Sequence, residues 1–171
     1  FQTLCDTLLG LDPRARESYH LDKLLAVSGM RLSEALNLTW EEIDFKKGFF
    51  IVSGGEVGTK NRQIRNVPLF PAMKMFLLEN YSIENENKSR RIVSIESARK
   101  ALETACRVAG LPHFSHHCLR HFFVSNAIEK GIDFKTIANW IGHTDGGLLV
   151  AKTYGHLRDA HSYQMAQLMT E

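Results

Sequence analysis

The chain has 171 residues, enough for one domain of ordinary size, and its 44% hydrophobic content is enough for a buried core. No stretch approaches the roughly 18 apolar residues that a membrane-spanning helix needs, and no charged-then-apolar leader opens the sequence, so we expect a cytoplasmic protein without a membrane partner. The three cysteines lack paired spacing, which excludes a disulfide framework. A net charge of +2 does not by itself establish a nucleic-acid partner.

Helical periodicity dominates the first part of the chain. Residues 1–9 predict a short helix, and residues 14–28 predict a second helix with Gly29 at its C-terminal cap. A third, short helix is expected over residues 32–38. The TWEE sequence that follows has the spacing of a capping box, which predicts a single helical turn.

The pattern then becomes that of an antiparallel hairpin. Residues 49–52 are aromatic and β-branched and predict a strand, and the glycine-rich residues 53–59 predict the hairpin tip. Residues 63–69 alternate and predict the returning strand, which ends near Pro68 and Pro71. One small antiparallel sheet is therefore expected within a helical domain.

Helices are expected to make up most of the remaining chain. The polar residues 80–88 and the glycine-rich residues 142–147 indicate loops, and Asp133 can cap a helix. The expected helices cover residues 71–79, 95–109, 116–130, 133–141 and about 158–169. The fold class that follows is α+β, mainly α-helical.

Basic residues gather in one stretch of the sequence. Residues 88–107 contain six basic and two acidic residues, whereas residues 79–86 are acidic. Such a strip suits contact with a phosphate backbone, and it equally suits a solvated helix face. The residues that we consider for DNA contact are Arg62, Arg90, Arg91, Arg99 and Lys100.

His117 and Arg120 are the first candidates for chemistry. They lie three positions apart on an expected helix, so both project from one face. An imidazole beside a guanidinium suits a bound anion better than an apolar core, although a surface helix with ion pairs is the alternative interpretation.

The neighbouring histidines raise the possibility of a zinc site. The zinc-protease pattern needs a glutamate directly after its first histidine, and Cys118 occupies that position here. No second cluster supplies further ligands in a familiar order, so we expect no metal. The residues concerned are His113, His116, His117, Cys118 and His121.

Four further residues are candidates with ordinary alternatives. Arg31 begins a short helix, where its charge opposes the helix dipole, and a bound anion shared with the helix end would favour it there. Lys60 at the hairpin tip could simply be solvated. His143 could serve as a charge partner at a helix C-terminus, and Tyr154 could pack its ring and point its hydroxyl at water.

Taken together, these candidates are two arginines, two histidines, a lysine and a tyrosine. This set suits one task, which is the stabilisation of a charged phosphorane while a tyrosine attacks phosphorus. A metal-dependent nuclease would need clustered carboxylates instead, and an ATP-binding protein would need a glycine-rich phosphate loop.

The order of these residues resembles the catalytic domain of the tyrosine recombinases, the phage integrase family. The matching motifs cover nearly the whole chain from about Leu21 onward and are SGMRLSEALNLTWEEIDF, TKNRQIRNVPL, HCLRHFFVSNAIEKG, IGH and TYGHL. The resemblance implies the mainly helical family fold with a small antiparallel sheet on one side. It also implies that residues 1–171 form a single catalytic domain and that the family's separate N-terminal DNA-binding domain is absent from this chain.

Two departures from the family pattern stand out. Family members most often have an acidic residue at the position of Cys118, which is not among the catalytic groups. Tyr154 lies eleven positions after His143, and in many relatives this spacing is nine. Residues 145–148 look like a local lengthening, which leaves the path of the tyrosine-bearing loop open.

The resemblance implies a site-specific DNA recombinase. Tyr154 would attack a DNA phosphate and leave a 3′-phosphotyrosine and a free 5′-hydroxyl, and a 5′-hydroxyl from a partner strand would reverse the attack. Neither metal nor ATP nor another cofactor is implied, because the ester keeps the bond energy.

The resemblance also implies a role for each remaining group. Arg31 and Arg120 would hold the non-bridging phosphate oxygens with charge-assisted, planar contacts. His117 would act as acid and base near the tyrosine, and His143 would donate to a phosphate oxygen. Lys60 would protonate the departing 5′-oxygen.

The implied partners are double-stranded DNA and other copies of the same protein. Relatives work as tetramers on two duplexes and often pass a C-terminal segment to a neighbour. The candidate segment here is 157–171, from Leu157 to Glu171. The competing interpretations are a type IB topoisomerase-like enzyme that relaxes DNA, a DNA-binding module without catalysis, and a zinc protein.

Overall fold

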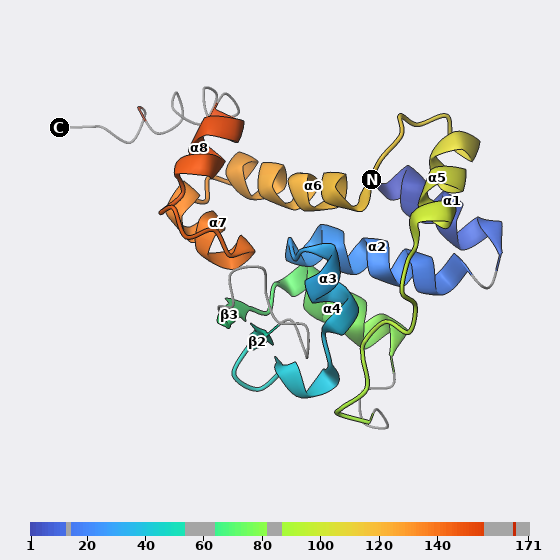
Figure 1. Ribbon diagram of the computed structural model, residues 1–171, viewed down its shortest axis with the longest axis horizontal. Helices are drawn as coiled ribbons and strands as arrows, with labels where there is room; N and C mark the ends of the chain where they lie inside the picture. The colour runs from blue at the N-terminus through green and yellow to red at the C-terminus, as the bar shows by residue number, and fades with distance from the viewer. Residues whose placement is uncertain (13–14, 54–63, 82–86, 156–165, 167–171) are drawn as a thin grey trace.

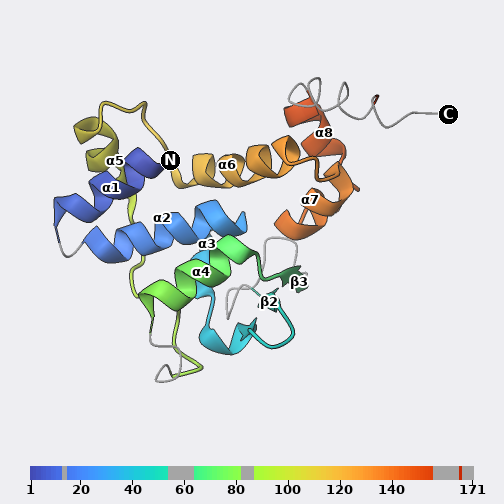
Figure 2. The same ribbon diagram turned by 180° about the vertical axis from the view of Figure 1, so that it is seen from behind.

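A computed structural model describes residues 1–12, 15–53, 64–81, 87–155 and 166 of the chain. Figures 1 and 2 both show α2 and α6 running alongside each other, with α1 and α5 at one end and α7 and α8 at the other. The helices are α1 (Gln2–Leu11), α2 (Arg16–Ser28), α3 (Leu32–Asn37), α4 (Pro71–Asn80), α5 (Arg99–Val108), α6 (His116–Glu129), α7 (Phe134–Ile141) and α8 (Leu148–Tyr154). None of these helices is long and apolar enough to cross a membrane.

The small sheet is antiparallel and has the strand order β1-β2-β3. Its strands are β1 (Ile43–Asp44), β2 (Phe49–Val52) and β3 (Arg65–Pro68). Phe50 of β2 pairs with Val67 of β3, and both side chains are buried. The expected hairpin strands are thus confirmed, whereas β1 was not expected because two residues are too few to show a period. Because β3 contacts α7, the sheet lies beside that helix (Figure 1).

The apolar core has two parts. The larger part surrounds α2, whose Leu21, Leu24 and Leu25 are almost completely buried. The smaller part joins α6, α7 and α8, and Val150 is the buried residue that α8 contributes to it. This second part fixes the position of α8 relative to α6, because apolar surface removed from water is the main source of stability in such packing.

Local capping signals explain where several elements begin and end. Gly29 ends α2 with a left-handed φ of 67°, and its N–H donates to the carbonyl of Leu25. The Asp133 side chain accepts from the backbone N–H of Thr136 at the start of α7. In the TWEE turn the backbone N–H of Thr39 donates to the carboxylate of Glu42. These three predictions from the sequence are confirmed.

The helix expected over residues 95–109 begins later than its apolar spacing suggested. The helix in the structure is α5, which starts at Arg99, and Ile95 lies in the irregular segment before it. Ala98 at the N-terminal cap is 1% exposed, and Ile95 packs against the core from outside the helix. Burial of these two side chains therefore does not depend on helical periodicity, and the prediction was wrong at its start.

Helix α8 was missing from the sequence prediction, which placed Tyr154 on a loop. Both carboxylate oxygens of Asp145 accept backbone N–H groups, from Gly147 and from Leu149, and this capping starts the helix. The apparent lengthening at residues 145–148 is thus the start of α8, and Tyr154 is its last residue. The expected helix at about 158–169 lies almost entirely outside the described residues.

The turn before α8 gives a test of this local structure. Gly146 and Gly147 both have positive φ, but only at Gly147 would a Cβ collide with backbone, at 2.8 Å from the carbonyl oxygen of Phe134. We expect Gly146→Ala to cost about 1–2 kcal/mol, as left-handed backbone does for an L-residue, and Gly147→Ala to cost clearly more. Urea unfolding of both variants measures the difference. Equal losses would show that the contact with Phe134 does not constrain the turn.

Candidate active site

Five of the six expected catalytic residues lie at two adjoining pockets. The first pocket has a volume of about 500 Å³, and the candidates that line it are Arg31, His117, Arg120 and His143. The second, of about 190 Å³, is lined by His117, Arg120, His143 and Tyr154. The shared residues join the two pockets into one site between α3, α6, α7 and α8. Lys60 lies outside the described residues, so its expected place in the site stays a prediction.

Arg120 is the most deeply buried cation of the site. Its side chain extends from α6, and its two terminal nitrogens donate to the carbonyl oxygens of Gly29 and Ile141, both at 2.8 Å. Burial, together with the positive charges of Arg31 and Arg65, lowers the pKa of Arg120 to about 10. The guanidinium is therefore charged at neutral pH, and it faces a pocket that suits an anion.

Arg31 is held at the N-terminus of α3 by a carboxylate in the same helical turn. One terminal nitrogen donates to Glu34 Oε1 at 2.9 Å, and the other donates to the carbonyl oxygen of Gly142 at 3.2 Å. The backbone N–H of Arg31 also donates to Glu34 Oε2. Glu34 therefore compensates the unfavourable charge at the helix start, and the bound anion expected there stays a prediction.

Arg65 and Glu34 were missed by the sequence analysis. Arg65 of β3 forms a two-pronged contact with Glu34, at 3.0 Å to Oε1 and 2.8 Å to Oε2, and its Nε donates to the carbonyl oxygen of Trp140 at 2.9 Å. Burial alone would raise the pKa of Glu34, but hydrogen bonds from Arg65 and Arg31 and their charges hold it below its usual value. The spacing of Arg31 and Glu34 in the RLSE sequence was a usable signal, since it matches the glutamate position of a capping box.

His143 follows the C-terminus of α7 and is partly buried. Burial, and then the charges of Arg120 and Arg31, lower its pKa, so the ring is neutral at pH 7. Its Nδ1 is buried and has no hydrogen-bond partner among the described residues. A neutral imidazole beside two guanidinium groups can donate one N–H to an anion without adding a further positive charge.

His121 lies between His117 and Tyr154. Its ring centroid is 4.5 Å from that of His117 and 5.5 Å from that of Tyr154. Burial and the nearby charges of His117 and Arg120 lower the pKa of His121. The sequence analysis considered His121 only as a zinc ligand, whereas the structure places it against the tyrosine at the end of α8.

The histidines considered for zinc point to different partners. His116 Nε2 lies 3.4 Å from Oδ1 of Asp22 on α2, and His113 Nε2 lies 3.7 Å from Glu103 on α5. His121 faces Tyr154 instead. Within the part of the chain that the structure describes, no three His, Cys, Asp or Glu side chains gather in a group that could hold a metal ion.

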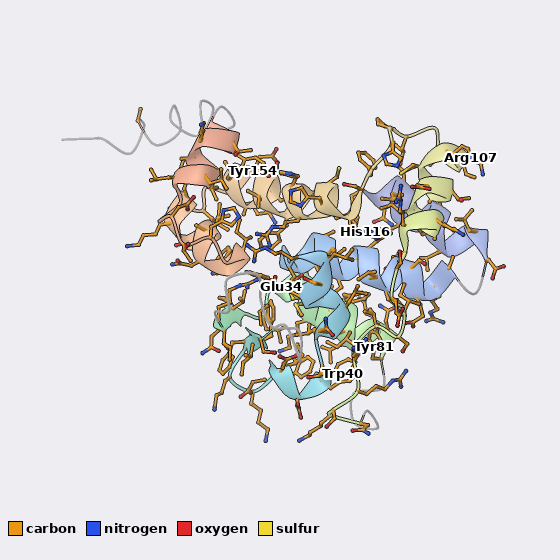
Figure 3. All side chains as sticks on the ribbon, in the orientation of Figure 1. Glu34, Trp40, Tyr81, Arg107, His116 and Tyr154 are labelled. Carbon is orange, nitrogen blue, oxygen red and sulfur yellow. The ribbon has the colours of Figure 1, made fainter. Side chains whose placement is uncertain are left out.

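The residues considered for DNA contact are all exposed where they are described. Arg99 on α5 forms an ion pair with Glu103 at 2.9 Å, and Arg90, Arg91 and Lys100 also lie at the surface. Figure 3 shows Arg107, at the end of the basic strip, on the opposite side of the molecule from Tyr154. Arg62 lies outside the described residues. Their contact with DNA stays a prediction.

Comparison with known proteins identifies the family. Residues 2–161 match the phage integrase family. Tyrosine recombinase XerA of Pyrococcus furiosus is 33% identical over 147 residues, which are 80% of this chain and 51% of that protein. The TnP I resolvase of Bacillus thuringiensis is 29% identical over 139 residues, 79% of this chain and 49% of that protein. The chain belongs to the phage integrase family, and it spans about half the length of these relatives.

Solved structures show the same fold. The catalytic domain of bacteriophage HP1 integrase aligns with a TM-score of 0.66 and 20% identity over 99% of this chain and 93% of that chain. The XerH site-specific recombinase in a post-cleavage complex with palindromic difH substrate aligns with a TM-score of 0.68 and 19% identity, over 99% of this chain and 51% of that chain. The expected fold, mainly helical with a small antiparallel sheet, is confirmed.

The buried pair beside the site gives a pH-dependent prediction. Burial raises the pKa of Asp22 to about 8 and lowers that of His116, so at pH 7 we expect a protonated carboxyl facing a neutral imidazole. When the pKa of a carboxyl is higher in the folded than in the unfolded chain, the free energy of unfolding falls as the pH rises, here from about 4 through 8. Asp22→Asn should therefore gain stability relative to the wild type over this range, by at least about 1 kcal/mol.

Urea unfolding at about pH 5 and pH 8.5 measures this difference. Asp6→Asn is the matched control, because Asp6 is an exposed aspartate on α1 and should show no such trend. A difference between Asp22→Asn and the wild type that does not change with pH would mean that Asp22 is ionised throughout and is paired with a protonated His116.

Proposed function

We propose that the protein is a site-specific DNA recombinase that cleaves and rejoins DNA through a tyrosine. The observation that carries the proposal is the meeting of two arginines and two histidines in one pocket that adjoins Tyr154. The phage integrase family and its named recombinases support it. A structure of the Tn1549 transposon integrase in complex with DNA, with a TM-score of 0.73 and 18% identity over 99% of this chain and 64% of that chain, supports a DNA substrate.

The two arginines supply the binding of a phosphate. Each guanidinium has five N–H donors in a plane, and the carbonyl and carboxylate contacts of Arg31 and Arg120 use only part of them. Planar N–H pairs match the oxygens of a phosphate better than an ammonium does. His143 adds a neutral donor beside them. The pocket is thus arranged to hold the non-bridging oxygens before the reaction begins.

Tyr154 supplies the nucleophile. In the cleavage step its oxygen forms a bond to phosphorus while the bond from phosphorus to the 5′-oxygen breaks. His117 takes the phenolic proton, and Lys60 gives a proton to the departing 5′-oxygen. The positive charges of Arg31 and Arg120 stabilise the extra negative charge of the transition state, and their effect is large because the site is partly shielded from water.

The products are a 3′-phosphotyrosyl ester and a free 5′-hydroxyl. Because the ester conserves the energy of the DNA backbone, a 5′-hydroxyl from another strand can reverse the reaction without ATP or metal. Exchange of strands requires two duplexes and several copies of the enzyme, so we propose a tetramer. The segment 157–171 is the part of the chain that we propose passes to a neighbouring copy.

Replacement of Tyr154 tests the nucleophile. Tyr154→Phe removes only the hydroxyl and leaves the ring in contact with His121, so DNA affinity should change less than about threefold while the covalent adduct is lost. The substrate is a nicked duplex that carries the native attachment site, and denaturing electrophoresis detects the adduct. Tyr81→Phe, which removes a hydroxyl far from the pocket, is the control. An adduct in Tyr154→Phe would show that another residue attacks.

Replacement of Lys60 tests the proposed proton donor. Lys60→Ala should slow cleavage of ordinary DNA by roughly 10²–10⁴-fold. It should regain most of its rate on DNA with sulfur in place of the scissile 5′-bridging oxygen, because a thiol has a pKa of about 8.5 and its thiolate leaves without a proton. Arg120→Ala is the control and should not recover, since the sulfur leaves the non-bridging oxygens unchanged. No recovery of Lys60→Ala would mean that the proton comes from another group.

A further inference from the structure

We propose that Arg65 is a positioning residue that joins β3, the strand that follows Lys60 in the sequence, to the two segments that carry Arg31 and His143 at the pocket. The inference rests on the recombinase function proposed above, because in that function Lys60 and the pocket residues act on the same DNA phosphate. Arg65 lines neither of the two pockets, so it acts through other residues and does not touch the reacting atoms.

Arg65 links three elements through one guanidinium. It is the first residue of β3, the strand that returns from the hairpin, and its side chain is only 12% exposed. Its two terminal nitrogens bind both oxygens of Glu34, which is 31 residues away on α3. Its Nε binds the carbonyl oxygen of Trp140 in the last turn of α7. These three side-chain contacts therefore join segments that are distant in the sequence.

Each linked segment carries a catalytic candidate. Glu34 Oε1 accepts from Arg65 and from Arg31, so a shift of the carboxylate would also move the Arg31 guanidinium. The α7 segment continues into Gly142, whose carbonyl oxygen accepts from Arg31, and then into His143. Figure 3 shows Glu34 on the side of α3 that faces α7 and the sheet.

The close packing of Arg65 against Gly142 supports the same assignment. A Cβ at position 142 would lie 2.8 Å from a terminal nitrogen of Arg65 and 3.0 Å from its central carbon. Gly142 also has a left-handed φ of 71° as the C-terminal cap of α7. The guanidinium thus occupies the space that a side chain would need, and it fixes the turn that leads to His143.

A lysine cannot replace Arg65 in this arrangement. An ammonium keeps the positive charge that the buried Glu34 carboxylate needs, but it has a single nitrogen. It cannot bind both oxygens of Glu34 and the Trp140 carbonyl with the geometry of the guanidinium. Arg65→Lys therefore separates the charge of Arg65 from its linking role, and it is the informative substitution.

The first measurement is the rate of a single round of cleavage by the full-length protein on the nicked duplex. We expect Arg65→Lys to cleave about 10–100-fold more slowly, because a displacement of about 1 Å in a reacting group can cost 10²-fold. Noncovalent DNA affinity, measured in the Tyr154→Phe background, should change less than about threefold. Arg16→Lys is the control, since Arg16 is exposed at the start of α2 and lines neither pocket of the site, so this variant should cleave normally.

The substrate with the 5′-bridging sulfur separates the two sides of the link. Recovery of Arg65→Lys should fall between that of Lys60→Ala and that of Arg120→Ala, because both the proton donor and the phosphate pocket are displaced. A cleavage rate equal to that of the wild type on ordinary DNA would overturn the proposal. Full recovery on the sulfur substrate would also overturn it, because the pocket would then be unaffected by Arg65.

Hydrogen exchange tests the link without DNA. Arg65→Lys should speed exchange about tenfold or more in β3 and also at the N–H of His143, which donates to the carbonyl of Ala138. Amides in α5 should not change. Faster exchange in β3 alone would refute the link whether or not the protein is a recombinase. Faster exchange in both places, combined with no adduct from the wild type, would instead refute the recombinase function and leave the link standing.

Discussion

The buried carboxylate of Glu34 is the constraint on which the rest of the site depends. Three guanidinium groups, those of Arg31, Arg65 and Arg120, lie close enough to one another for their charges to interact. Like charges at such distances repel, and burial strengthens the repulsion because water screens it less. Glu34 accepts from two of the three guanidinium groups and so allows them to share one buried region. Removal of one partner from a buried ion pair typically costs 3–5 kcal/mol.

Helix ends provide the remaining negative charge. The carbonyl of Gly29 at the end of α2 and that of Ile141 at the end of α7 accept from Arg120, and the carbonyl of Gly142 accepts from Arg31. The last carbonyls of a helix have no partner within the helix and carry the negative end of its dipole. The arginines satisfy these carbonyls and are stabilised by them. The same contacts therefore satisfy the carbonyls at the ends of two helices and orient the arginine side chains at the pocket.

The sequence predicted those parts of the molecule that are set by residues close together along the chain. The cap at Gly29 and the approach of His117 to Arg120 follow from spacing along one segment. The Arg65–Glu34 contact spans 31 residues and could not be inferred from local spacing. Helix α8 escaped prediction because its seven residues are few and its start depends on Asp145, which is preceded by a polar turn. The family resemblance identified the catalytic candidates, but it did not show what holds them in place.

The balance of charge in the site explains why it suits a phosphate. One carboxylate and a few carbonyl dipoles face three guanidinium groups, so the described site retains a positive charge in a partly buried place. Burial first, and then the positive charges of neighbouring guanidinium groups, lower the pKa of Arg120 and of His143. A phosphodiester would reduce the repulsion, and the additional negative charge of a phosphorane would reduce it further. Stabilisation that increases from the bound substrate to the transition state is the kind that accelerates a reaction.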